Sequence, residues 1–259
     1  MISAYERFRA LHEGPEAFVM PNAWDGESAM VLQRLGFGAI GSTSLGLALS
    51  LAREDGTHAI SRDEAVAHAA FLSRVSGLPV NGDLEDGFGV DPEDCAATVK
   101  AAIDAGLAGL GIEDTTADPA HPIHDFDRAV ARIAAAAAVA RGRILLTGRT
   151  DNYLHDRLDL DDTIRRLTAF AEAGADVLYA PFLPDMDAIV AVVRAVAPKP
   201  VNVLIGPEDG TLKLAQLSAA GVRRVSTGGA LYLRAMGALT KIAEAMRRGD
   251  FSSVRGPGD

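Results

Sequence analysis

Acidic side chains follow three successive apolar runs of the chain. Asp83 and Glu85 come at the end of LPVNGD and just after it, Glu113 ends LAGLGIE, and Asp55 lies in the polar segment after FGAIGS. Carboxylates held close together raise each other's pKa values, and a divalent cation removes that penalty. Oxygen ligands suit Mg²⁺, with Mn²⁺ as a substitute. The pattern predicts a metal site at these residues, against the alternative that GDLEDGFG is only a solvated acidic turn.

A single arginine, Arg149, ends the apolar run RILLTGR. The two parallel N–H groups of a guanidinium suit a carboxylate or a developing oxyanion, so we expect Arg149 to contact substrate. The alternative is a structural ion pair with Asp83 or Glu113, and the two roles are compatible.

The hydroxyl-rich segment GSTSLG, residues 41–46, begins a short helical stretch. Its backbone N–H groups are suited to an anionic oxygen at a helix start. The alternative is that Thr43 or Ser44 only caps the helix.

Other reactive side chains have simpler interpretations. Cys95 falls inside an apolar helix and is expected to be a small buried hydrophobe. His121, His124 and Tyr153 are candidates for proton transfer, although loop histidines are more often solvated. Trp24 is expected to pack beside the pocket.

The elements that position these residues alternate regularly along the chain. Short apolar runs with many β-branched residues alternate with stretches of helical period, which often end at glycine. Strands are predicted at 17–22, 37–42, 78–83, 107–113, 143–149, 175–181, 200–206 and 223–228. Helices are predicted near 26–35, 62–76, 92–105, 125–141, 160–173, 185–197, 211–220 and 230–248. Eight such units predict an α/β fold, a (β/α)₈ barrel of the TIM type, with an open doubly wound sheet as the alternative.

Length and composition limit the class of protein. The 259 residues suit one barrel domain, 1–259, with a core of about 17–248 and a loose tail at 249–259. The net charge of −10 argues against a nucleic-acid partner. The single cysteine allows no internal disulfide, and no apolar run approaches the roughly 20 residues that span a bilayer. With no signal-peptide pattern at the N-terminus, we expect a cytoplasmic protein without a membrane partner.

Five motifs in a fixed order are similar to those of the isocitrate lyase/phosphoenolpyruvate mutase superfamily: IGSTSLG, GDLEDGFG, LGIEDTT, GRTDNYL and AGADVLYAP. The resemblance covers about residues 17–245. It implies a Mg²⁺-bearing barrel that binds α-keto or α-hydroxy acids and makes or breaks C–C or C–P bonds. It also implies a homodimer or homotetramer with a swapped C-terminal helix.

The resemblance further implies roles for individual residues. Asp83 matches the direct metal ligand, and Glu85, Asp55 and Glu113 match residues that hold the metal mainly through water. Thr43, Ser44 and Leu45 match the segment that binds the substrate carboxylate, while Arg149 matches the oxyanion-stabilising arginine. The substrate pocket is expected to include these residues together with Trp24 and Asn202.

The chain departs from the family pattern at three places. It lacks the KKCGH loop of the lyase branch, it has TTADPAHPIHD where the mutase branch has a lysine and an asparagine, and Gly41 replaces an aromatic residue. We therefore expect a Mg²⁺-dependent lyase acting on a small α-keto or 2-hydroxy dicarboxylic acid, such as oxaloacetate, 2-oxoglutarate or a methylisocitrate-like acid. C–C cleavage would leave an enolate stabilised by the metal and by Arg149, with Glu113 and Asp55 as further catalytic residues. The alternatives are a non-catalytic keto-acid-binding paralogue and a C–P phosphonomutase or hydrolase.

Overall fold

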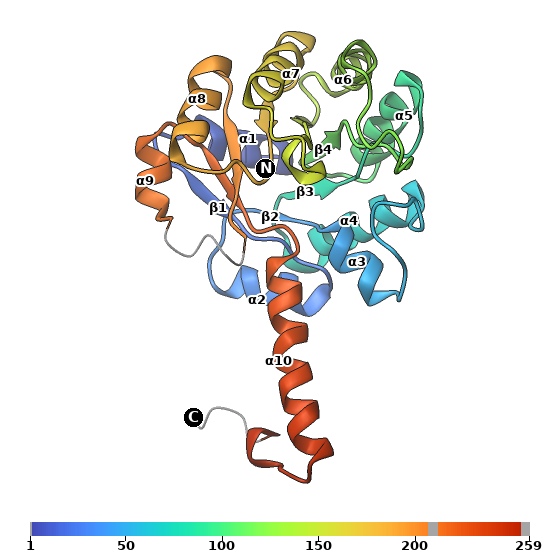
Figure 1. Ribbon diagram of the computed structural model, residues 1–259, viewed down its shortest axis with the longest axis vertical. Helices are drawn as coiled ribbons and strands as arrows, with labels where there is room; N and C mark the ends of the chain where they lie inside the picture. The colour runs from blue at the N-terminus through green and yellow to red at the C-terminus, as the bar shows by residue number, and fades with distance from the viewer. Residues whose placement is uncertain (1, 207–211, 255–259) are drawn as a thin grey trace.

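Eight parallel strands form a nearly closed barrel in the computed structural model, which describes residues 2–206 and 212–254 (Figure 1). The strands follow one another in the order β1-β8-β7-β6-β5-β4-β3-β2, and an isolated bridge between Asn22 and Gly41 links the two edge strands. The predicted barrel is therefore confirmed, and each predicted strand is present. The strands are β1 (Phe18–Met20), β2 (Ile40–Gly41), β3 (Val80–Asp83), β4 (Gly109–Glu113), β5 (Leu145–Arg149), β6 (Val177–Tyr179), β7 (Val201–Leu204) and β8 (Arg224–Ser226).

Helices surround the barrel at the predicted places. They are α2 (Gly26–Arg34), α4 (Arg62–Ser76), α5 (Pro92–Asp104), α6 (Phe126–Ala140), α7 (Leu160–Ala173), α8 (Met186–Val196), α9 (Leu214–Ala219) and α10 (Ala230–Arg247). The long segment after β2 contains the extra short helix α3 (Ser44–Ser50). Residue 211, in the helix predicted at 211–220, and tail residues 255–259 lie outside the described part of the chain.

The N-terminal helix α1 (Ala4–Glu13) is absent from the sequence-based prediction. Ser3 and Glu6 form a reciprocal capping box at its start, and this S-x-x-E spacing is the signal that identifies a helix N-terminus. The fully buried Phe8 packs with Ala108 and Leu145, at the beginnings of β4 and β5. The helix therefore closes the barrel at the end opposite the strand C-termini.

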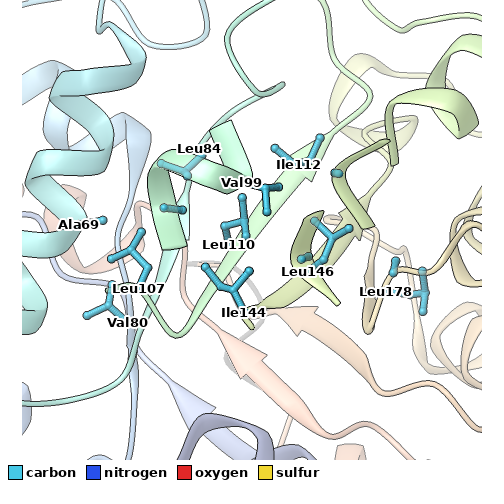
Figure 2. Packing of buried hydrophobic residues seen from close by; sticks show 14 of the residues in the cluster. Ala69, Val80, Leu84, Val99, Leu107, Leu110, Ile112, Ile144, Leu146 and Leu178 are labelled. Atoms are coloured by element: carbon cyan, nitrogen blue, oxygen red, sulfur yellow. The ribbon is translucent and has the colours of Figure 1, made fainter. Parts of the chain in front are cut away.

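Most of the hydrophobic core lies between the barrel wall and the surrounding helices. Figure 2 shows Leu110 and Ile112 of β4, Leu146 of β5 and Leu178 of β6 within this layer. Because side chains alternate along a strand, the intervening residues of β4, including Glu113, face the barrel axis. The apolar layer thus fixes the direction in which the polar residues point.

The last helix, α10, projects away from the barrel (Figure 1). Only Tyr232 and Ala245 of its 18 residues are buried, whereas Leu233, Leu239 and Met246 are exposed. Among the described residues, no helix has the length and apolar character needed to cross a membrane.

Candidate active site

Glu113 and Arg149 occupy neighbouring positions at the ends of β4 and β5. Their Cα atoms pair in the parallel register, and Arg149 Nη1 lies 2.9 Å from Glu113 Oε2. Arg149 Nε donates to Asp151 Oδ1 at 2.7 Å, and the guanidinium lies 5.3 Å from the centre of the Tyr179 ring. The ion pair considered as an alternative for Arg149 is therefore present, and contact with substrate stays a prediction.

Asp83 lies beside this pair at the end of β3. Its Oδ1 is 3.9 Å from Arg149 Nη1, and its Oδ2 accepts a hydrogen bond from the Ser44 backbone N–H at 2.8 Å. The Asp83 N–H in turn donates to Ser42 Oγ at 2.8 Å. These contacts attach the hydroxyl-rich segment to β3, so the Ser44 N–H already has a carboxylate acceptor.

Thr43 caps the start of α3. Its hydroxyl accepts from the Gly46 N–H at 3.3 Å, as the capping alternative expected. The side chain of Leu45 lies so close to Gly229 that a Cβ added there would be only 2.9 Å away. In this structure the segment 43–45 thus connects β3 with the start of α10.

Glu85 and Asp55 complete the acidic cluster. The strand β3 ends at Asp83, and Glu85 adopts a left-handed conformation with φ of 49°. The strand therefore does not continue through Glu85, and the two carboxylates are not alternate positions of one strand. Burial and the charges of Asp83 and Asp55 raise the pKa of Glu85 to about 8. Burial and Asp83 also raise the pKa of Asp55, whose Oδ1 is buried and has no hydrogen-bond partner.

These observations test whether the cluster suits a cation. Within residues 2–206 and 212–254, no group of three or more His, Cys, Asp or Glu side chains is placed to hold a metal ion directly. Arg149 pairs closely with Glu113 and lies 3.9 Å from Asp83. The charges of Asp83 and Asp55 still raise the pKa of Glu85, and Asp55 Oδ1 has no hydrogen-bond partner. An all-oxygen set with few direct ligands suits Mg²⁺, which keeps several waters and uses one or two carboxylates. The residues therefore fit the ion.

A cavity of about 60 Å³ opens beside Asp83, Glu113 and Arg149. Asn202 also lines it, and this buried amide donates to Ser226 Oγ at 2.9 Å. Trp24 lies elsewhere, edge-on to Tyr232 at 5.6 Å in a separate hollow against α2. Of the residues expected in the pocket, Arg149 and Asn202 thus line this cavity, whereas Trp24 does not.

The candidate proton-transfer groups lie outside this cavity. His121 is exposed and pairs with Asp118 at 3.0 Å, and Tyr153 lies in a short turn of 3₁₀ helix. Burial and Arg132 lower the pKa of His124 to about 4. Burial raises the pKa of the Cys95 thiol to about 11, and its fully buried position confirms the expected packing role.

Several lining residues were not predicted. Asn81, Thr147, Tyr179 and Arg224 face the same cavity from within the barrel. These residues lie before the ends of the predicted strands, and none of them was predicted as a site residue, although the period-2 alternation in RRVSTG places Arg224 and Ser226 on one face of β8. Extending that alternation along whole strands would have identified them.

Comparison with known proteins identifies the class. The model of the phosphoenolpyruvate phosphomutase family matches residues 8–247. A crystal structure from Burkholderia cenocepacia J2315, provisionally assigned as a lyase/mutase, is 48% identical with a TM-score of 0.93, and the match covers 98% of this chain and 92% of that one. An uncharacterized protein of Mycobacterium tuberculosis H37Rv is 35% identical over 245 residues, 94% of this chain and 90% of its own. An oxaloacetate decarboxylase of Chromohalobacter salexigens is 30% identical over 241 residues, 88% of this chain and 80% of its own.

The matched barrel and motifs are those of the isocitrate lyase/phosphoenolpyruvate mutase superfamily. Within it, the chain belongs to the phosphoenolpyruvate phosphomutase family. The family resemblance drawn from the five sequence motifs is confirmed.

Proposed function

We propose that this protein is a Mg²⁺-dependent lyase that cleaves a C–C bond of a small α-keto dicarboxylic acid, with decarboxylation of oxaloacetate as the first reaction to test. The observation that carries the proposal is the meeting of Asp83, Glu113 and Arg149 around one cavity at the strand C-termini. This is the end of a (β/α)₈ barrel at which active sites lie. The related oxaloacetate decarboxylase of Chromohalobacter salexigens supports the choice of reaction.

Asp83, Glu85 and Asp55 would hold the cation, directly or through water. Glu113 would lie between the cation and Arg149. When bound, Mg²⁺ would polarise the substrate carbonyl as a Lewis acid. Arg149 is held by Asp151 and Glu113, so its guanidinium is oriented before substrate arrives. Fixed donors of this kind stabilise negative charge that develops on the carbonyl oxygen. Glu113 in turn keeps Nη1 of Arg149 directed toward Asp83.

Decarboxylation also agrees with the departures from the family pattern. Loss of CO₂ leaves the bond electrons on an enolate, which then takes a proton from water to give pyruvate, so no residue has to remove a proton from the substrate. No cysteine lines the cavity, and Cys95 is buried behind the barrel wall. Retro-aldol cleavage needs a base, and none of the proton-transfer candidates reaches the site. A keto-acid-binding paralogue without turnover is the second candidate, favoured by the same missing loop residues.

We further propose that the functional form is a homodimer or homotetramer in which α10 packs on a neighbouring subunit. The exposed apolar residues of this projecting helix support the proposal.

A panel of keto acids tests the function. Wild-type protein should release pyruvate and CO₂ from oxaloacetate, followed by NMR, only when Mg²⁺ is present. A keto acid that binds, added at 100 times its Kd, should raise the free energy of unfolding by about 2.7 kcal/mol. Asp83→Asn should lower kcat/KM at least about 100-fold, because the charge that orients the cation is lost.

The matched control is Asp104→Asn, which removes an exposed carboxylate paired with Lys100 on α5. Its kinetics should equal those of wild type. Stabilisation by keto acid and Mg²⁺ without product would support the binding paralogue instead, and equal turnover by Asp83→Asn would exclude the proposed site.

A further inference from the structure

A large cavity lies at the opposite end of the barrel from the acidic cluster. This basal cavity has a volume of about 660 Å³, and its wall includes Tyr5 and Arg9 of α1 together with Lys199 and Arg223, which precede β7 and β8. Its volume falls within the range of small-molecule sites, about 300–1,000 Å³. Active sites of (β/α)₈ barrels lie at the other end, so the proposed reaction leaves this cavity without a role.

His12 separates the basal cavity from the cavity of the candidate active site. It lines the basal cavity, and its Nε2 lies 3.4 Å from Nη1 of Arg224, which lines the active-site cavity. Both side chains are buried. The two cavities are therefore distinct, and a ligand in the basal cavity would not contact the acidic cluster.

Cations that are withdrawn from solvent are paired elsewhere in the described part of the chain, but not at this end of the barrel. Those with a carboxylate within ion-pair distance are Arg62, Arg132, Arg149 and Arg166. Lys199 and Arg223 are half-buried and Arg224 is buried, and none of the three forms an ion pair with a described residue. Charges removed from water are costly unless they are paired. The unpaired cations thus gather around the basal cavity.

The carboxylates that line the basal cavity have other partners. Glu13 pairs with Arg9 at 3.2 Å, and Asp176 Oδ2 accepts a hydrogen bond from the Leu146 backbone N–H at 2.9 Å. Burial raises the pKa of Asp176, and Lys199 opposes that rise without forming an ion pair with it. Neither carboxylate therefore pairs directly with the two half-buried cations, although the chain as a whole has a net charge of −10.

Lys199 and Arg223 come from neighbouring strand beginnings. The strands β7 and β8 pair in parallel, and the Arg223 N–H donates at 3.1 Å to the carbonyl oxygen of Val201, which follows Lys199 by two residues. An ammonium binds phosphate oxygens as a point charge, and a guanidinium binds them through two parallel N–H groups. A phosphate monoester carries a charge of about −1.5 to −2 near neutral pH, which matches two cations, whereas a carboxylate matches only one.

The basal cavity also has apolar wall, to which Tyr5, Val193 and Pro198 contribute, and its volume exceeds what a phosphate group alone would fill. We propose that Lys199 and Arg223 bind the phosphate group of a small phosphorylated metabolite, whose organic part lies against this apolar wall. The inference does not rest on the proposed function, because it uses none of the residues of the acidic cluster.

Calorimetry with phenyl phosphate tests the site, with EDTA present so that no metal-bound phosphate at the acidic cluster contributes. Wild-type protein should bind phenyl phosphate with a Kd of about 1 mM or below. Benzoate has the same ring but a single charge, and it should bind at least about tenfold more weakly. Lys199→Gln and Arg223→Gln should each weaken the binding of phenyl phosphate at least about tenfold, because each removes one of the two cations.

Lys241→Gln and Arg128→Gln are the matched controls, because each removes the same type of charge from an exposed position on α10 or α6. Both should bind phenyl phosphate as wild type does. Unfolding midpoints without ligand report any structural role of the two cations. Lys199→Gln and Arg223→Gln should unfold no lower than wild type, since neither substitution breaks an ion pair between described residues. Added phenyl phosphate should raise the midpoint of wild type more than that of either variant.

The proposal would be overturned if wild type did not bind phenyl phosphate up to about 10 mM. Equal affinity for phenyl phosphate and benzoate would also overturn it, because the site would then not select the doubly charged group. Unchanged affinity in both Lys199→Gln and Arg223→Gln would place the ligand elsewhere, and lower midpoints of both variants without ligand would make the two cations structural. Each of these results would leave the proposed lyase reaction standing, since that reaction takes place at the other end of the barrel.

Discussion

Arg149 is the residue that divides the acidic cluster. It neutralises Glu113 at 2.9 Å but lies 3.9 Å from Asp83, and so leaves the Asp83 side with excess negative charge. The raised pKa of Glu85, about 8, has burial as its largest cause and the charges of Asp83 and Asp55 as the next ones. The guanidinium of Arg149 would therefore neutralise Glu113, and a divalent cation would neutralise the remaining carboxylates of the cluster. This division is the physical basis for assigning oxyanion stabilisation to Arg149 and cation binding to the other three residues.

Much of this cluster could be predicted from residue types at strand ends. Asp83, Glu113 and Arg149 each end a strand in the structure. The left-handed conformation of Glu85 was not predictable, because non-glycine residues rarely adopt it and tertiary contacts decide where they do. Arg224 was missed because the prediction was limited to residues at strand ends, although the alternation along RRVSTG places Arg224 on the same face of β8 as Ser226.

At the scale of elements, regular alternation of strands and helices made the fold predictable. The strands and helices of the eight units occur where hydrophobic period and terminal glycines placed them. The helix α1 was not predicted because it lies outside that repeat. Its role depends on contacts with the beginnings of strands that come much later in the chain. Which loop residues face the cavity also depended on long-range contacts: Trp24 turned toward Tyr232 of α10.

The position of α1 leads to a prediction about acid stability. Burial and Arg224 lower the pKa of His12 from 6.5 to about 3. The unfolded chain therefore binds a proton below about pH 6.5 that the folded chain does not, and stability falls as pH drops from about 6.5 toward 3. The loss reaches about 2 kcal/mol at pH 5, from about 1.4 kcal/mol per pH unit.

Urea unfolding at pH 7 and pH 5 measures this effect. His12→Gln should show a loss smaller by about that amount, because glutamine does not titrate. His121→Gln, which removes an exposed histidine, should lose stability in the same way as wild type. An unchanged pH dependence in His12→Gln would contradict the burial of a neutral His12 against Arg224.

In the whole molecule, α10 stands out because it projects from the barrel and most of its side chains are not buried. It leaves the barrel beside the site, at Gly229, where Leu45 packs against its start. A partner subunit that covers its exposed leucines would explain both its length and its position. Assembly and the active site would then be coupled through the segment 43–45, which contacts Asp83 through Ser44.

Disruption of this helix surface tests the oligomer. Leu239 is 58% exposed, and Leu239→Lys should convert the dimer or tetramer to monomer in light scattering, because a charge would be buried in the interface. Leu158→Lys is the control, since Leu158 is 73% exposed in the loop before α7. A wild-type monomer, or a Leu239→Lys variant with unchanged mass, would contradict the proposed role of α10.

We expect Asp83 and its acidic neighbours to hold one divalent cation, and titration with Mn²⁺ measures this without any assumption about substrate. Calorimetry, supported by electron paramagnetic resonance of free Mn²⁺, should give one ion per wild-type chain, displaced by Mg²⁺. Asp83→Asn should weaken binding at least about tenfold, whereas Asp104→Asn should bind as wild type does. Absence of binding to wild type, or equal affinity in Asp83→Asn, would contradict the account.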